Sequence, residues 1–308
     1  MISFYKTINN RIAPIETAED DCWINVVAPT DNEIQQLVND YGIEPDFFRA
    51  SLDEEESSHI DSEDGNTLII IDVPISEKPD DNLIYYTMPI GIIFIEKHII
   101  TVSLKENPVL QEFSNGVVRN VQTNLKTQFV LHIFYRIANR YLQYLKQIDK
   151  ISSFVETELR KSMRNKELTQ LMDLEKSLVY FSTSLKSNEV TLEKILRGRF
   201  IKLYDEDQDL LEDVLIEIKQ AVEMANIYLS ILSGTMDAFA SVISNNLNIV
   251  MKVLTSITIL MSVPTLIFSF YGMNVDLPGN HLGILFPIGI SIITTAITGV
   301  FLHKKDML

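Results

Sequence analysis

The sequence predicts an α+β membrane protein: a cytoplasmic α/β domain, then a long helical stalk that is continuous with the first of two C-terminal transmembrane helices. Two uncharged runs predict the spans, because residues 253–270 and 282–302 contain no Asp, Glu, Lys or Arg. Each run reaches the roughly 18 to 20 residues that a helix needs to cross a bilayer. Strand and turn signals are confined to the first third of the chain, and Pro is absent between Pro108 and Pro264.

Composition excludes several classes of protein. The 308 residues include 26 Lys and Arg against 42 Asp and Glu, a formal net charge of −16, which argues against nucleic-acid binding. The 46% apolar content argues against a disordered chain. A single cysteine, Cys22, allows neither an intramolecular disulfide framework nor a Cys-built zinc cluster. Residues 1–20 have no apolar core segment and no Arg-rich amphipathic pattern, so we expect no secretory signal or transit peptide.

The first domain, residues 1–115, is predicted to mix strands and helices. Residues 23–27 form a short strand, and Thr30 with Glu33 has the capping-box spacing that starts a helix. That helix should run to about Tyr41 and stop at Gly42, and a second helix should begin near Pro45. The acidic stretches 53–56 and 61–64 are typical of turns. Further strands are predicted by the β-branched runs 68–73, 91–95 and 99–102.

Residues 116–247 are predicted to form long cytoplasmic helices, with breaks near 164–165 and 198–209. The last helix should begin near Gln208 and continue into the first span, residues 248–270. Roughly 60 residues of continuous helix extend about 90 Å, which is far more than one bilayer requires. We therefore expect this helix to leave the membrane as a stalk.

Polar residues of the first span fall on one seam with a 3.5-residue period. The seam consists of two series spaced by seven, Asn248, Thr255, Ser262 and Ser269, and Met251, Thr258, Thr265 and Gly272. Ser256 is the exception. In the stalk the same phase continues through Ser244, Ser241, Asp237, Gly234, Ser230, Ile227, Glu223 and Gln220.

Two interpretations of the seam compete. Small and hydroxyl-bearing residues allow transmembrane helices to pack closely. Polar groups inside a membrane also mark ion or substrate routes. The polar stalk series, which includes Asp237, favours the second interpretation, because a coiled-coil seam should be apolar there. One helix cannot enclose a pore, so a conduction route requires several copies of the chain around an axis.

Basic residues near the spans predict the orientation. Lys252 sits at the start of the first span, the tail 303–308 contains Lys304 and Lys305, and the loop 271–281 contains no Lys or Arg. We expect the loop outside and both termini in the cytoplasm. The second span, 282–302, is apolar and suits an outer ring that faces lipid.

The tetrapeptide Tyr271-Gly272-Met273-Asn274, placed between the first span and a short loop, resembles the signature of the CorA family of divalent-cation transporters. The resemblance extends through residues 248–255 and to Trp23-Ile24 with Pro29-Thr30, and it covers essentially the whole chain. It implies a homopentamer in a plasma membrane, such as a bacterial inner membrane, that takes up Mg²⁺ driven by the membrane potential. One departure is that Leu277-Pro278 is followed by Gly279 rather than an acid, which leaves Asp276 as the only acid of the loop.

By the same resemblance, Gly272 and Asn274 form the outer mouth, where a backbone carbonyl and an amide oxygen meet the ion first. Asn248, Met251, Leu254 and Thr265 match pore-lining positions, with Met251 and Leu254 as an apolar constriction. The full set of residues predicted to line the route is Asn248, Met251, Leu254, Thr255, Thr258, Ser262, Thr265 and Ser269.

The acidic start of the stalk, residues 205–213, allows two interpretations. These residues are either solvated surface charges without a specific role or part of a regulatory site. The resemblance implies that Asp213 lies where regulatory Mg²⁺ bridges neighbouring subunits and holds the channel shut, with Asp80 or Asp81 as its partner. Asp237 is a further candidate cation contact in the stalk.

Other chemistry finds no support in the sequence. The five His, at positions 59, 98, 132, 281 and 303, show no metal-ligand pair at helical spacing. We find neither a nucleophile–base pair nor a phosphate-binding Gly-rich loop in the sequence, either of which would argue for an enzyme. The open alternatives are a carrier of Zn²⁺, Co²⁺ or Ni²⁺ with the same fold, for which His281 is the one hint, and a non-conducting membrane-anchored scaffold or sensor.

Overall fold

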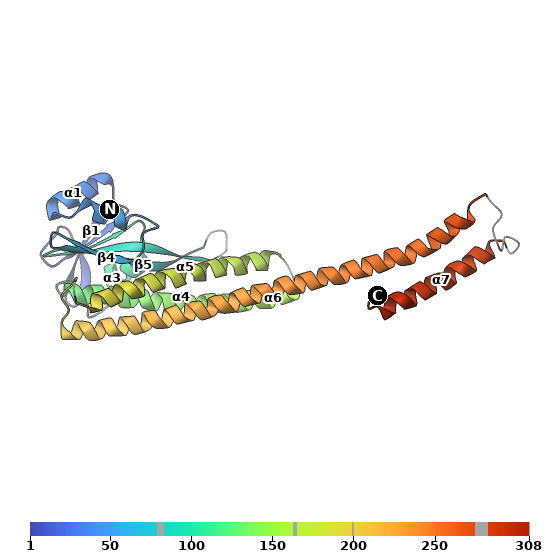
Figure 1. Ribbon diagram of the computed structural model, residues 1–308. Coiled ribbons are helices and arrows are strands. Elements are labelled where there is room, and N and C mark those ends of the chain that lie inside the picture. Colours follow the sequence, from blue (N-terminus) through green and yellow to red (C-terminus); the bar gives the residue numbers. More distant parts are fainter. Residues whose placement is uncertain (79–82, 163–164, 199, 275–282, 308) are drawn as a thin grey trace. The chain divides into compact units, whose positions relative to one another are not determined.

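A computed structural model describes residues 1–307 except 79–82, 163–164, 199 and 275–282. Contacts between residues divide the chain into two compact units, Met1–Gly234 and Thr235–Leu308. The first unit contains a sheet with helices on both faces, and the second contains the C-terminal part of the longest helix together with the last helix (Figure 1).

The sheet of the first unit has seven strands in the order β2-β1-β3-β7-β6-β5-β4. Only the central β3–β7 pair is parallel, so the sheet is mixed. Because helices cover both faces, β5 and β7 are buried along most of their length, as expected for strands without a solvated face. The strands are β1 Ile2–Ile8, β2 Arg11–Ile15, β3 Trp23–Val27, β4 His59–Glu63, β5 Asn66–Glu77, β6 Ile84–Phe94 and β7 Ile99–Ser103.

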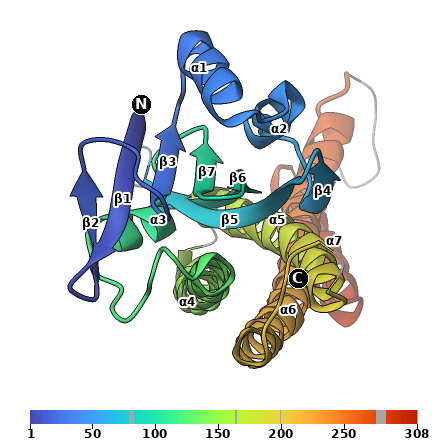
Figure 2. The same cartoon turned by 90° about the vertical axis from the view of Figure 1, so that its left-hand side faces the viewer.

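Two short helices, α1 Asp31–Tyr41 and α2 Pro45–Ser51, cover one face of the sheet (Figure 2). The capping box is confirmed: the Glu33 amide donates to the Thr30 hydroxyl, and the Thr30 amide donates to the Glu33 carboxylate at 2.8 Å. Gly42 ends α1 with a left-handed φ of +64°, a conformation that costs glycine little. Leu37 of α1 and Phe47 and Phe48 of α2 are buried in the core against the strands.

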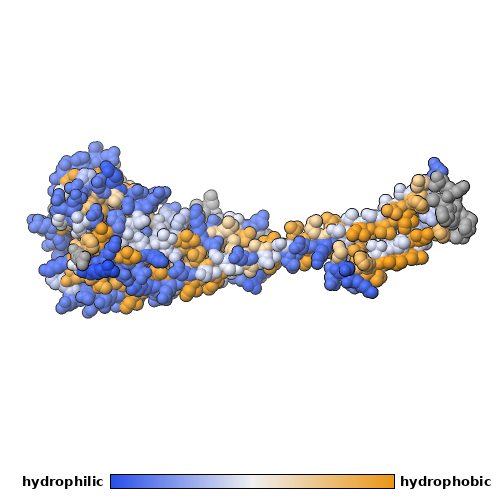
Figure 3. Space-filling model, in the orientation of Figure 1, coloured by the Kyte–Doolittle hydropathy of each residue, from blue (hydrophilic) through white to orange (hydrophobic). Residues whose placement is uncertain are grey.

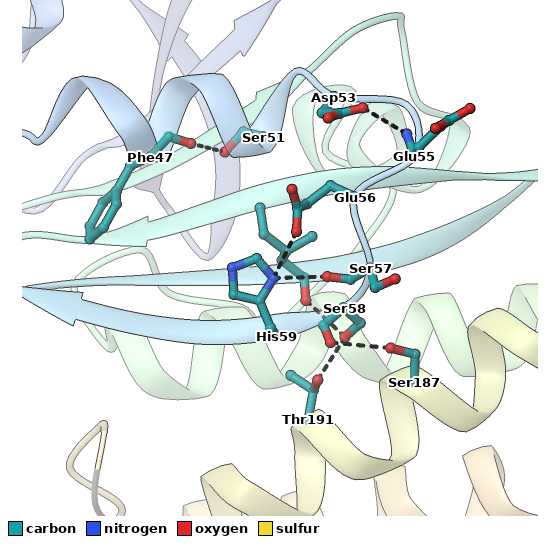
Figure 4. Close-up of polar contacts among 11 residues, drawn as sticks. Phe47, Ser51, Asp53, Glu55, Glu56, Ser57, Ser58, His59, Ser187 and Thr191 are labelled. Atoms are coloured by element: carbon teal, nitrogen blue, oxygen red, sulfur yellow. Dashed lines mark hydrogen bonds and ion pairs between the residues drawn. The ribbon is translucent and has the colours of Figure 1, made fainter.

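The opposite face carries α3 Pro108–Ser114 and the long helices α4 Lys126–Ser162 and α5 Asn165–Leu196 (Figure 2). Buried polar groups attach α5 to the sheet. Ser58, just before β4, donates to the Thr191 hydroxyl at 2.8 Å, and Ser187 donates to the Ser58 carbonyl at 3.1 Å (Figure 4). These bonds fix the edge of the sheet on α5.

Helix α6 runs from Asp205 to Tyr271, 67 residues without interruption, and α7 runs from Leu285 to Lys304. Within the first unit α6 packs beside α5, where Lys219 lies 3.0 Å from Glu193 and Ser182 donates to Asn226 at 2.7 Å. The predicted stalk helix that continues into the first span is thus confirmed.

The structure also corrects several expectations about elements. Residues 61–63 lie in β4 rather than in a turn, and the three predicted β-branched runs extend into longer strands. Strands β1 and β2 lie in a segment to which the sequence analysis assigned no elements, and α3 was not predicted. Helix α6 begins three residues before Gln208. The division of the first 247 residues at position 115 stays a prediction.

Candidate functional site

The second unit exposes an apolar surface of a kind that water-soluble proteins rarely show. Two helices have the length and composition to cross a membrane, α6 with a mean hydropathy of 1.9 and α7 with 2.0 over their most apolar windows. Large apolar side chains of both helices are exposed; Leu266 of α6 is 72% exposed and Ile297 of α7 is 65% exposed. Figure 3 shows this hydrophobic surface gathered on the two helices. A lipid environment explains it.

The seam predicted on α6 is exposed along its whole length. Every hydroxyl-bearing member between Thr255 and Ser269 is exposed, whereas Ser256, the exception to the seam, is completely buried. The hydroxyl-bearing members are Thr255, Thr258, Ser262, Thr265 and Ser269.

Helix α7 lies on the other side of α6 from the seam. Ser256 donates to the carbonyl of Met307, beyond the end of α7, at 2.7 Å, and the rings of Tyr271 and Phe286 lie 5.9 Å apart. Between these contacts, a methyl group placed on Gly299 would lie 3.7 Å from Leu260. At about 100° per residue, the α7-facing positions are separated from the seam by roughly 160°. The seam is therefore not the surface on which α6 and α7 pack together.

The seam hydroxyls donate their protons to their own helix. Thr258 donates to the Leu254 carbonyl at 2.8 Å, Ser262 to the Thr258 carbonyl at 2.7 Å, and Thr265 to the Met261 carbonyl at 2.9 Å. A hydroxyl that donates inward keeps its lone pairs as acceptors for a ligand outside the helix. The seam thus presents hydrogen-bond acceptors, which suit the water molecules around a hydrated cation.

A groove of about 790 Å³ follows the seam. Pro264 lies inside α6 and removes the hydrogen bond to the Leu260 carbonyl, and proline is a common cause of helix bending. Figure 1 shows α6 curving in its C-terminal part with α7 on the outer side of the curve. The groove is lined by Ile257, Thr258, Met261, Ser262, Thr265, Leu266, Ser269, Phe270 and Met273.

The predicted constriction lies on the N-terminal side of these hydroxyls along α6. Met251 is 53% exposed and Leu254 is 57% exposed in the single chain, and Asn248 is exposed one turn earlier. The structure places all three on the exposed surface of α6. Their role in a constriction stays a prediction, as does that of Asp237, which is also exposed on α6.

At the other end of the seam, α6 stops at Tyr271, and Gly272 and Asn274 follow it. The Gly272 amide still donates to the Phe268 carbonyl at 2.9 Å, so the signature continues directly from the helix. Asn274 is exposed, as a first contact for an ion requires. Asp276, Gly279 and His281, which bear on ion preference, lie outside the described residues.

Among the residues that the structure describes, the acidic side chains do not gather into a metal site within one chain. Asp213 is exposed on α6, and no group of three His, Cys, Asp or Glu able to hold a metal occurs among the residues that the structure describes. Asp80 and Asp81 lie outside those residues, so their pairing with Asp213 stays a prediction. In the stretch 53–56, Asp53 accepts from the Glu55 amide at 2.9 Å and Glu56 lies 3.5 Å from His59 (Figure 4).

Two features escaped the sequence analysis. The contact between Ser256 and Met307 joins residues 51 positions apart, and no local pattern signals it. In the first unit, Asp72 is buried on β5, and this burial raises its pKa to about 6. A strand that is covered on both faces lacks the usual alternation of buried apolar and exposed polar residues. Its sequence pattern therefore does not reveal which polar residue is buried. Cys22 is buried in the core of the first unit.

Comparisons with known proteins give a consistent picture. The family model described as CorA-like Mg²⁺ transporter protein matches residues 19–304. The cobalt/magnesium transport protein CorA of Methanocaldococcus jannaschii is 26% identical over 82% of this chain and 79% of its own length. The protein of the same description from Thermotoga maritima is 20% identical over 99% of this chain and 88% of its own. The structure of the M. jannaschii CorA magnesium transporter superposes with a TM-score of 0.80 at 21% identity, covering 99% of this chain and 96% of that one.

Proposed function

Because the chain belongs to the family of CorA-like Mg²⁺ transporter proteins, we propose that it is a homopentameric channel that imports hydrated Mg²⁺ through a plasma membrane and is closed by cytoplasmic Mg²⁺. Members of this family are membrane transporters of divalent cations, and the two apolar C-terminal helices fit that role. In the proposed orientation both termini are cytoplasmic and the signature at Gly272 and Asn274 faces outside.

The observation that carries the proposal is the direction of the seam. Thr258, Ser262 and Thr265 point their acceptor lone pairs away from α7, into a groove that the single chain leaves open. Each hydroxyl already donates to its own helix, so exposure of such a row to lipid would leave only its acceptor lone pairs without hydrogen-bond partners. Several copies of α6 around one axis would turn these oxygens toward water instead, with α7 of each copy in an outer ring against lipid.

The oxygens along the route suit Mg²⁺ with its water shell. Mg²⁺ releases water reluctantly, and neutral hydroxyl, carbonyl and amide oxygens accept hydrogen bonds from that shell without the tight binding of a carboxylate cage. Gly272 and Asn274 would make the first contacts. Two charges that cross a potential of 100 mV gain roughly 4.6 kcal/mol, which supports accumulation of about a thousandfold without ATP.

Feedback by cytoplasmic Mg²⁺ is proposed to act through acids at subunit boundaries. Exposed carboxylates such as Asp213 repel one another across a boundary between copies of a chain with a net charge of −16. A bridging cation removes this repulsion, and its loss lets the subunits separate. Asp80 or Asp81 would supply the partner carboxylate, and Asp237 would attract cations along the stalk.

Transport of Co²⁺ is the second candidate, because two of the similar proteins are described as cobalt/magnesium transport proteins. Zn²⁺ and Ni²⁺ carriers differ from it only in ion preference. The scaffold alternative predicts a protein of the same fold with no flux at all.

Uptake into proteoliposomes separates these candidates. We expect the purified full chain to take up Mg²⁺ faster when the inside is made negative, and Asn274→Ala to abolish this uptake while the oligomer still assembles. Parallel measurements with Co²⁺, Ni²⁺ and Zn²⁺ rank the ions. If the wild-type chain takes up none of the four ions, or if Asn274→Ala has no effect, the proposed function is wrong.

A further inference from the structure

Ser256 differs from the other hydroxyl-bearing residues of α6 in the direction of its bond. It is 0% exposed, and its hydroxyl donates to the carbonyl of Met307 at 2.7 Å. Thr258, Ser262 and Thr265 instead donate to carbonyls four residues earlier in α6. A serine that gives up this local bond connects two separate parts of the second unit.

The carbonyl that Ser256 meets is held in place by the backbone after α7. The Asp306 amide donates to the His303 carbonyl and the Met307 amide donates to the Leu302 carbonyl, both at 3.1 Å. Asp306 has a left-handed φ of +53°, which completes a Schellman turn. Leu302, at the base of this turn, is only 3% exposed. The hydrogen bond with Ser256 uses the backbone carbonyl of residue 307 and not the Met307 side chain. It therefore requires only that the chain extends to residue 307.

Two further contacts between α6 and α7 in the described part of the chain are made by aliphatic and aromatic groups. They join Leu260 with Gly299 and Tyr271 with Phe286. An apolar side chain in a membrane gains little free energy from packing on a neighbouring helix instead of on a lipid tail. A directional hydrogen bond therefore holds one helix against the other more specifically. Ser256 makes that bond two residues from Leu254, at the predicted constriction.

We propose that Ser256 and the Met307 carbonyl form a C-terminal clasp that positions the end of α7 against α6 beside the constriction, and that opening this clasp changes ion flux. Ser256 lies away from the seam and touches no ion, so it is a positioning residue. The bond exists only while the C-terminal end of α7 stays against α6 at Ser256, and its loss therefore favours arrangements in which that end moves away from α6. The part of the proposal that concerns flux rests on the proposed function.

Hydrogen exchange of the full chain in lipid nanodiscs tests the clasp itself. Ser256→Ala should speed exchange of the Asp306 and Met307 amides by about two- to tenfold, the range expected for one lost hydrogen bond. Met307→Ala keeps the carbonyl and should exchange like the wild type, and Ser256→Thr keeps the hydroxyl and should do the same. Unchanged exchange in Ser256→Ala would overturn the clasp.

Mg²⁺ uptake into proteoliposomes tests whether opening the clasp changes ion flux. Ser256→Ala and a chain that ends at Asp306 should change the initial rate by the same factor, and the two changes together should have no larger effect than either alone. Met307→Ala and Ser256→Thr serve as matched controls and should keep the wild-type rate. Equal rates for Ser256→Ala and the wild type overturn the flux part. If the wild type itself takes up no ion, the proposed function and the flux part fail together, and the exchange comparison still decides whether the clasp exists.

Discussion

At the scale of single residues, Asp72 illustrates how burial changes chemistry. Its backbone amide donates to the Asn188 side chain at 2.9 Å, and its carbonyl accepts from Asn188 at 2.8 Å and from the Tyr141 hydroxyl at 3.1 Å. These bonds hold the backbone of Asp72 against the helices α4 and α5, and its side chain is buried. Desolvation then raises the pKa of Asp72 to about 6.

This pKa predicts a specific dependence of stability on pH. Below the ordinary pKa of 3.8, Asp72 is protonated in both the folded and unfolded states and has no effect. Between that value and about 6, the folded state holds the proton more tightly, so its stability falls as the pH rises. Asp72→Asn should therefore stabilise the full chain by up to about 3 kcal/mol at pH 7.5 and very little near pH 4. Thermal unfolding at the two pH values checks this, and an equal difference at both would contradict it.

The seam shows what residue spacing alone can reveal. The positions of Thr258, Ser262 and Thr265 could be read from their period, because one helical face is fixed by sequence spacing. The direction of each hydroxyl proton could not, since it depends on the local carbonyl and on neighbouring chains. The same residue type at Ser256 therefore took a role that the pattern did not predict.

At the scale of elements, α2 lies so close to β6 that only glycine fits between them. A methyl group on Gly91 would come within 1.8 Å of the Ser51 hydroxyl oxygen and 2.6 Å of the Ser51 Cβ. Ser51 is fully buried and donates to the Phe47 carbonyl at 2.6 Å (Figure 4). The helix therefore cannot approach the strand unless position 91 has no side chain.

We predict that Gly91→Ala destabilises the first unit by about 1–3 kcal/mol, the usual cost of overpacking. Adding Ser51→Gly to the same chain removes both clashing atoms and should restore part of the loss. Chemical unfolding of the full chain in detergent measures both variants. A Gly91→Ala variant as stable as the wild type would show that α2 moves away freely.

Elements with local signals were predictable, and those defined by long-range pairing were not. Thr30, Glu33 and Gly42 fixed α1 because capping depends on adjacent residues. The uncharged runs identified α6 and α7 because a bilayer sets a required length. Strand β4 was missed because its exposed edge carries Asp61 and Glu63, and only pairing with β5 makes it a strand.

At the scale of the whole molecule, the proposed feedback assigns a role to the acidic start of α6. Asp213→Lys would replace a cation ligand with a competing charge, so we expect Mg²⁺ inside proteoliposomes to inhibit uptake less than in the wild type. Flux measured over a range of internal Mg²⁺ checks this. Glu212→Lys, one residue away and also exposed, is the control for a general change in charge. Inhibition that is unchanged in Asp213→Lys would reject the assignment.

The family and its membrane helices followed from the sequence, whereas the proposed pairing of Asp213 with Asp80 or Asp81 stays a prediction. A signature such as Tyr271-Gly272-Met273-Asn274 is local and therefore readable. A site between subunits depends on how separate copies of the chain pack together. Neither the residue spacing in the sequence nor the structure of one chain gives that packing.

In the proposed assembly, the seam of α6 faces a water-filled route shared by several copies of the chain. Single cysteines placed along α6 in a Cys22→Ala background and exposed to a charged, membrane-impermeant thiol reagent test it most directly. We predict that modification at Thr258, Ser262 and Thr265 blocks Mg²⁺ uptake. Cysteines at Leu260, which contacts α7, and at Ile267, seven residues later on the same side of α6, should stay unmodified. Modification at Leu260 and Ile267 with an unreactive seam would contradict it.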